Sequence, residues 1–88
     1  MTPELEVLEQ ILDESLPLSV IAGLFPDLVH CKRAIEAMIR DHQVRLVDPS
    51  GEAVPPWRFR QIADDPALWG EGTGFRLHMA DRGAELVG

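Results

Sequence analysis

Apolar residues in the first part of the chain recur at helical spacing and predict an amphipathic helix over residues 3–15. Thr2 suits the N-cap, and Pro3 suits the first helical position because the N–H that proline lacks has no partner there. Pro17 is expected to end the helix. The residues that should face the core are Leu5, Leu8, Ile11, Leu12 and Leu16.

A short helix over residues 19–25 and a longer one over residues 28–41 are expected next. Ser19 can cap the first, and Asp27, after Pro26, can cap the second. The residues of the longer helix that recur every three or four positions are Leu28, Cys31, Ile35, Met38 and His42. Its outer face should carry His30, Lys32, Arg33, Glu36 and Arg40. His42 and Gln43 take the place where a helix often closes in a left-handed residue. Glycine is more usual there, so a strained or differently shaped end is the alternative.

Apolar and polar residues alternate in two later segments, which predicts strands over residues 44–48 and 74–80. The letters DPSG after the first strand are a strong turn signal. Asp81 can cap a last short helix over residues 82–87. Gly83 weakens this helix, so the packing of Leu86 and Val87 is expected to hold it.

The two predicted strands are separated by residues 49–73, far more than a hairpin loop needs. This insertion is too apolar for a disordered linker, since it contains Trp57, Phe59, Ile62, Leu68 and Trp69. One helical turn is expected over residues 58–63, and another that Asp65 caps and Pro66 begins. Whether the insertion is ordered without a partner stays open.

The stretch SVIAGLFPDLVHCKRAIEAMIRDHQVRLVD, followed later by GFRLHMADRGAEL, resembles the winged helix-turn-helix superfamily. The likeness is to small bacterial transcription regulators whose last strand runs into a Thr/Ala-Asp-x-Gly turn, and it covers residues 5–48 and 73–87. It implies one mainly helical α+β domain over residues 1–88. That domain would have three helices, a two- or three-stranded wing sheet, a long Trp-containing wing insertion and a short C-terminal helix.

The resemblance also implies a DNA-binding regulator with residues 28–41 as its recognition helix. Winged helices of this size normally act as homodimers. Arg33 is then the candidate for a bidentate guanine contact and Lys32 for a phosphate contact. Val29 and Glu36 would also face the groove. The full set of expected DNA-binding residues is His30, Lys32, Arg33, Arg40, Arg45, Arg58 and Arg60.

The charge of the chain favours a different partner. Its 15 acidic and 8 basic residues give a net charge of −7, and residues 1–31 contain six acids and no Lys or Arg. Acidic surfaces repel DNA and steer basic partners. An acidic protein-interaction module, such as an adaptor, an inhibitor or an immunity-type partner of a basic protein, is the alternative function, and a structural subunit of a larger complex is a third. The partner-binding residues would be Glu6, Glu9, Asp13, Trp57 and Trp69.

Each of these candidate residues also has a purely structural interpretation. The acidic face can be a solvated surface, and the two tryptophans can fold the insertion back onto the core. Cys31 can be a small core residue or a redox sensor; as a single cysteine it favours a reducing cytoplasm.

Motifs for catalysis, cofactor binding and membrane insertion are missing from the sequence. We find no Walker loop, CxxC pair, HExxH, nucleophile elbow or metal-ligand spacing, so we expect neither an enzyme nor a bound metal or cofactor. No signal peptide is visible, and no apolar run reaches the length of a membrane span. The sequence therefore predicts a cytoplasmic binding protein.

Overall fold

The computed structural model describes residues 2–87, which form five α-helices, one 3-10 helix and a four-stranded antiparallel sheet. About half of the residues are helical. The elements are, in chain order, α1 (Pro3–Ile11), β1 (Leu16–Pro17), α2 (Leu18–Ala22), α3 (Leu28–Arg40), β2 (Val44–Val47), β3 (Ala53–Val54), α4 (Pro56–Ile62), η1 (Pro66–Trp69), β4 (Arg76–Met79) and α5 (Asp81–Val87).

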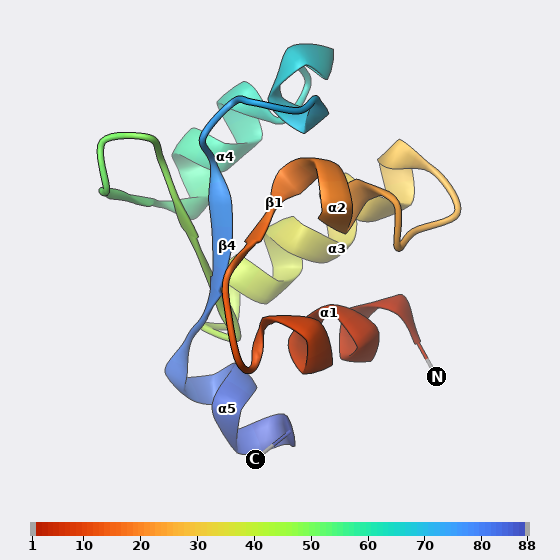
Figure 1. Cartoon of the computed structure of the whole chain (residues 1–88), viewed down its shortest axis with the longest axis vertical. Coiled ribbons are helices and arrows are strands. Elements are labelled where there is room, and N and C mark those ends of the chain that lie inside the picture. The colour runs from red at the N-terminus through yellow and green to blue at the C-terminus, as the bar shows by residue number, and fades with distance from the viewer. Residues whose placement is uncertain (1, 88) are drawn as a thin grey trace.

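The last strand of the chain lies inside the sheet, whose order is β1-β4-β2-β3. Leu77 pairs with Leu16 on one side and with Leu46 on the other, and Leu46 also pairs with Val54. Because paired residues share a face, these four side chains form one apolar row, while Arg45 and its neighbours in the strands face the other way. Figure 1 shows α1, α2 and α3 on one side of β4, with α4 near one end of this strand and α5 at the other.

The core lies between the apolar face of the sheet and the helices. Fully buried side chains come from α1, α3 and the two central strands, among them Leu8, Ile35, Leu46 and Leu77. The insertion contributes as well, since Phe59 of α4 is fully buried. Residues 49–73 are therefore a packed part of the domain, and both helical turns predicted within them are present as α4 and η1.

The predicted number of helices and strands was too low. In the insertion one of the two predicted helical turns is a full α-helix, α4, and the edge strand β3 was not predicted. Strand β1, the other edge strand, was not predicted either. β1 is only two residues long, and it is defined by its pairing with β4 rather than by a local pattern. A pattern search that needs several alternating residues cannot find such a strand.

Helix α1 ends at Ile11, four residues earlier than predicted. The chain leaves the helix there because it must turn before Leu16 pairs with Leu77. The expected apolar stripe was also wrong in part: Val7 is buried, whereas Leu5 is 41% exposed and Leu12 is 48% exposed. Thr2 does cap the helix, because its Oγ1 accepts a hydrogen bond from the Leu5 N–H at 3.3 Å.

Helix α2 begins at Leu18 and has Pro17 at its N-cap, so Ser19 lies inside the helix and is not its cap. Helix α3 begins where it was predicted: Asp27 Oδ1 accepts a hydrogen bond from the His30 N–H at 2.7 Å. At its other end the helix closes in a left-handed residue, which was one of the two alternatives for this position. His42 has a φ of 60°, and its N–H donates to the Ile39 carbonyl while the next N–H donates to the Met38 carbonyl.

Helix α5 packs through its glycine against the turn between α3 and β2. A Cβ atom at position 83 would overlap the carbonyl oxygen of Gln43 and lie 2.7 Å from Met79 Sδ. Only glycine allows this approach, which the sequence did not reveal. The helix was expected to be held by Leu86 and Val87; Val87 does pack on the core, but Leu86 is 55% exposed.

Candidate interaction surfaces

The predicted recognition helix α3 is placed with its cationic side outward. Cys31, Ile35 and Met38 are buried, whereas Arg33 and Arg40 are exposed and Lys32 and Glu36 are partly exposed, as the helical spacing predicted. On that surface the helix is not isolated, because α4 of the insertion packs beside it. The two helices border a groove of about 250 Å³, whose lining residues include Arg33 and Phe59.

Ion pairs occupy most of the cations between α3 and α4. Lys32 Nζ lies 3.4 Å from Asp64 Oδ1, just beyond the end of α4. Glu36 Oε1 accepts hydrogen bonds from two arginines, from Arg60 Nε at 2.7 Å and from Arg40 at 3.0 Å. Each of these acids adds negative charge next to a side chain that was expected to contact DNA. The positive potential that duplex phosphates need is therefore reduced along this helix.

The beginning of α3 is tied to α1. His30 Nε2 lies 3.3 Å from Glu4 Oε1, and its ring centroid lies 5.4 Å from that of Phe25. The histidine expected to face DNA thus joins the two helices on the protein's own surface.

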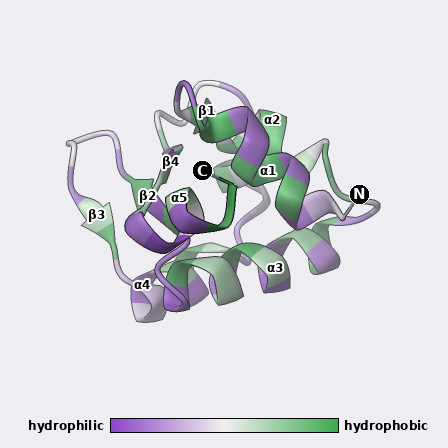
Figure 2. Ribbon diagram, turned by 90° about the horizontal axis from the view of Figure 1, so that it is seen from below, coloured by the Kyte–Doolittle hydropathy of each residue, from purple (hydrophilic) through white to green (hydrophobic). Residues whose placement is uncertain are grey.

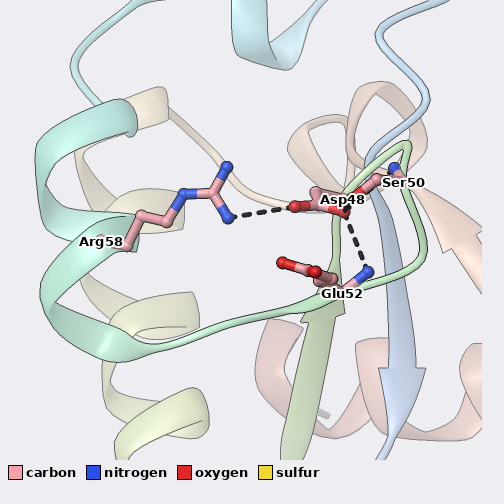
Figure 3. A network of polar contacts seen from close by, with 4 residues as sticks. All are labelled: Asp48, Ser50, Glu52 and Arg58. Carbon is pink, nitrogen blue, oxygen red and sulfur yellow. Dashed lines mark hydrogen bonds and ion pairs between the residues drawn. The ribbon is translucent and has the colours of Figure 1, made fainter.

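Asp48 gathers a network at the turn after β2 (Figure 3). The side chain is only 7% exposed, and its Oδ1 accepts hydrogen bonds from Ser50 Oγ at 2.6 Å, the Ser50 N–H at 3.0 Å and the Glu52 N–H at 2.9 Å. Arg58 of α4 donates to Oδ2 at 3.0 Å. These bonds, led by that of the Ser50 hydroxyl and followed by those of the Glu52 N–H and the guanidinium, hold the pKa of the Asp48 carboxyl well below its usual range. Arg58 therefore fixes the insertion to the sheet.

Five of the seven expected DNA-binding residues thus have acidic partners. The other two, Arg33 and Arg45, form no ion pair with any residue in the part of the chain that the structure describes. They lie on different elements: Arg33 on α3, and Arg45 on the outer face of the sheet opposite His78. The structure does not gather a basic patch from the predicted set.

The acidic residues of the first segment show the opposite behaviour. The acidic face of α1 and the turn after it, defined here as Glu6, Glu9, Asp13 and Glu14, is exposed as predicted. Among residues 2–87 none of these four carboxylates takes part in an ion pair. Figure 2 shows hydrophobic and hydrophilic residues alternating along the α1 ribbon, with α5 close by.

The two tryptophans have different roles. Trp69 is 7% exposed, its Nε1–H donates to the Ala63 carbonyl at 2.9 Å, and its ring meets that of Phe59 edge-on at 6.1 Å. Of its two expected roles Trp69 therefore has the structural one, because its side chain lies in the core and is not exposed for a partner. Trp57 is 64% exposed, on the outside of α4. A tryptophan exposed to this extent leaves a large apolar area for contact with another molecule.

Cys31 was expected to be either a small core residue or a redox sensor. Cys31 is fully buried, and burial raises the pKa of its thiol to about 12, which is consistent with a core residue and not with a reactive thiolate. Within residues 2–87, no three His, Cys, Asp or Glu side chains cluster so as to hold a metal ion. In the same region no helix has the length and apolarity to cross a membrane.

Comparisons with protein-family models, with curated proteins and with solved structures found no match.

The acceptor roles of Glu36 and Asp48 were not predicted. For Asp48 a signal was present, since an Asp followed by Pro-Ser-Gly is typical of a side chain that bonds the backbone of its own turn. For Glu36 there was no such signal, because Arg60 is 24 residues away along the chain.

Proposed function

We propose that this protein is an acidic interaction module that binds a basic protein. The observation that supports this most is the unequal pairing of its charges. Most of its lysines and arginines are engaged by its own acids, whereas the acidic face of α1 has no cationic partner within residues 2–87. The net charge of −7 is thus displayed mainly by unpaired carboxylates.

Such a surface attracts cationic partners over a distance of about 8–10 Å at physiological ionic strength. It raises the rate of encounter more than the final affinity, which depends on apolar contacts at the centre of the interface. Trp57 is an exposed side chain of the kind that supplies these contacts. In this proposal the acidic face attracts the basic partner, and Trp57 supplies an apolar contact to the same partner or to a second one.

DNA binding is the second candidate function, and one observation favours it. The order of α1, β1, α2, α3 and β2, closed by β4, is compatible with a winged helix-turn-helix domain in which β3, α4 and η1 are inserted in the wing. Arg33 and Arg45 would then be the cations available for phosphates or bases. We rank this function second because fold alone does not determine function and because the other expected contacts are neutralised.

The test compares charge variants as baits. The wild-type protein, a Glu6→Lys/Glu9→Lys variant and an Arg33→Ala variant are immobilised separately in an extract of the source cells, and retained proteins are quantified by mass spectrometry. We expect a basic protein that is retained by the wild type and by Arg33→Ala but lost from the double variant.

The same three proteins are titrated with labelled random duplex DNA at about 50 mM and 200 mM salt. Binding that weakens by orders of magnitude between these salts and disappears in Arg33→Ala would overturn the proposal in favour of DNA. Circular dichroism of each variant shows whether a lost interaction reflects a lost fold.

A further inference from the structure

The exposed side of α1 combines apolar and acidic residues in a definite order. Leu5 and Leu12 are seven residues apart, which is about two helical turns, so they lie on the same side of the helix about 10.5 Å apart along its axis. Leu12 keeps helical dihedral angles (φ −59°, ψ −42°) although it is the residue after the last helical one. The two half-exposed leucines therefore form a short apolar strip.

This strip lies between the buried side and the acidic side of the helix. At about 100° per residue, Leu8 precedes the strip by roughly 50°, while Glu9 follows it by roughly 50° and Glu6 by roughly 110°. The core covers Leu8 almost completely, whereas both glutamates are exposed. A molecule that covers the leucines must consequently place its next side chains against carboxylates.

These features specify the chemistry of the occupant. A helix that matches the strip needs apolar residues at positions i, i+3 or i+4, and i+7, and lysines or arginines along one border. A second copy of this chain, paired through its own α1, does not fit, because Glu6 and Glu9 of both copies would be brought together and like charges repel. The neighbouring helix α5 exposes a further leucine, Leu86, which is 55% exposed.

We propose that α1 docks a basic amphipathic helix of the partner protein, whose apolar side covers Leu5 and Leu12 and whose cations face Glu6, Glu9 and Asp13. This inference rests on the proposed function and adds the structural class of the partner's binding segment. With nine residues in α1, the contact is small, and the complex belongs with weak, transient interfaces unless other surfaces contribute.

The test uses two fluorescent peptides of identical leucine and lysine content, one ordered with helical periodicity and one ordered without it. Binding to the purified protein is measured by anisotropy. Leu5 is 41% exposed and Leu12 is 48% exposed, so their combined exposed area is slightly less than that of one fully exposed leucine. The periodic peptide can cover this whole area, and we therefore expect it to bind about tenfold more tightly than the other peptide.

Variants locate the binding. Leu5→Gln/Leu12→Gln should remove the advantage of the periodic peptide, whereas Val29→Gln, at an exposed apolar position on α3, should not. Glu6→Gln/Glu9→Gln should weaken both peptides. The matched control Glu52→Gln/Glu71→Gln changes the net charge equally, at exposed positions in the loops on either side of the α4–η1 segment, and should have a smaller effect.

The outcomes separate the two proposals. Equal affinity for both peptides, with weakening specific to Glu6→Gln/Glu9→Gln, would refute helix docking and leave the acidic module supported. If neither peptide binds, or if Glu52→Gln/Glu71→Gln weakens binding as much as Glu6→Gln/Glu9→Gln, then α1 is not a binding face for a basic partner. Both helix docking and the proposed role of the acidic face are refuted in that case. Thermal unfolding of every variant confirms that the fold is retained.

Discussion

Helix propensity and packing predict opposite effects of Gly83→Ala on the stability of the protein. In an exposed helix this change stabilises by about 0.5–1 kcal/mol, because alanine loses less conformational entropy than glycine on folding. In α5, however, the added Cβ overlaps the Gln43 carbonyl oxygen. That oxygen is held in place because it accepts a hydrogen bond from the Ala80 N–H at 3.1 Å, so it cannot move away freely.

The expected result is a loss of stability. Overpacking costs about 1–3 kcal/mol, occasionally more, and displacing α5 also weakens one backbone hydrogen bond worth about 1 kcal/mol. After the gain in propensity is subtracted, we expect the free energy of unfolding to fall by about 1–3 kcal/mol, which lowers the Tm of a domain of this size by about 4–24 °C.

Thermal unfolding followed by circular dichroism measures this shift. Ala84→Gly is the matched control: it lies on the same helix at an exposed position and should cost only the propensity difference of about 0.5–1 kcal/mol. A Gly83→Ala protein with an unchanged or raised Tm would refute the close approach of α5 to the turn between α3 and β2.

Three further predictions concern single residues. His42→Gly should raise the free energy of unfolding by about 0.5–1 kcal/mol in urea titrations, because histidine is strained at its φ of 60°. Trp69→Ala should cost about 3–5 kcal/mol and Trp57→Ala less than about 0.5 kcal/mol in the same assay; equal losses would contradict their opposite burial. Since folding lowers the pKa of Asp48, its contribution is complete above the unfolded-state pKa of about 4 and is lost as pH falls. Asp48→Asn should therefore unfold with a weaker acid dependence than the wild type, and an identical pH profile would refute this role.

Features that depend on a few neighbouring residues could be predicted from the sequence. The caps formed by Thr2, Asp27 and Asp65 were all predicted, and the structure confirms them. The left-handed closure at His42 was one of two alternatives for its position, and the structure has it. Each depends on contacts within about four residues, where amino-acid type and spacing carry the information.

Features that depend on the tertiary arrangement could not be predicted. The same residue type is buried at position 69 and exposed at position 57, and only the packing against Phe59 and the Ala63 carbonyl distinguishes them. The pairing of Lys32 with Asp64 joins residues 32 positions apart and was equally invisible. This pairing changes the functional expectation, because a cation counted as free in the sequence is neutralised in the fold.

The position of β4 has a consequence for synthesis of the protein. Within the described residues β1 pairs with no strand except β4, and the ladder between β2 and β4 begins only at Arg76. As the ribosome extends the chain, residues up to 75 therefore cannot complete the sheet, and the apolar side chains of Leu16 and Leu46 lack their common neighbour Leu77. Such late, non-local pairing slows folding and exposes apolar surface in the meantime. The nascent chain is thus a candidate for chaperone binding until residues 76–79 have emerged.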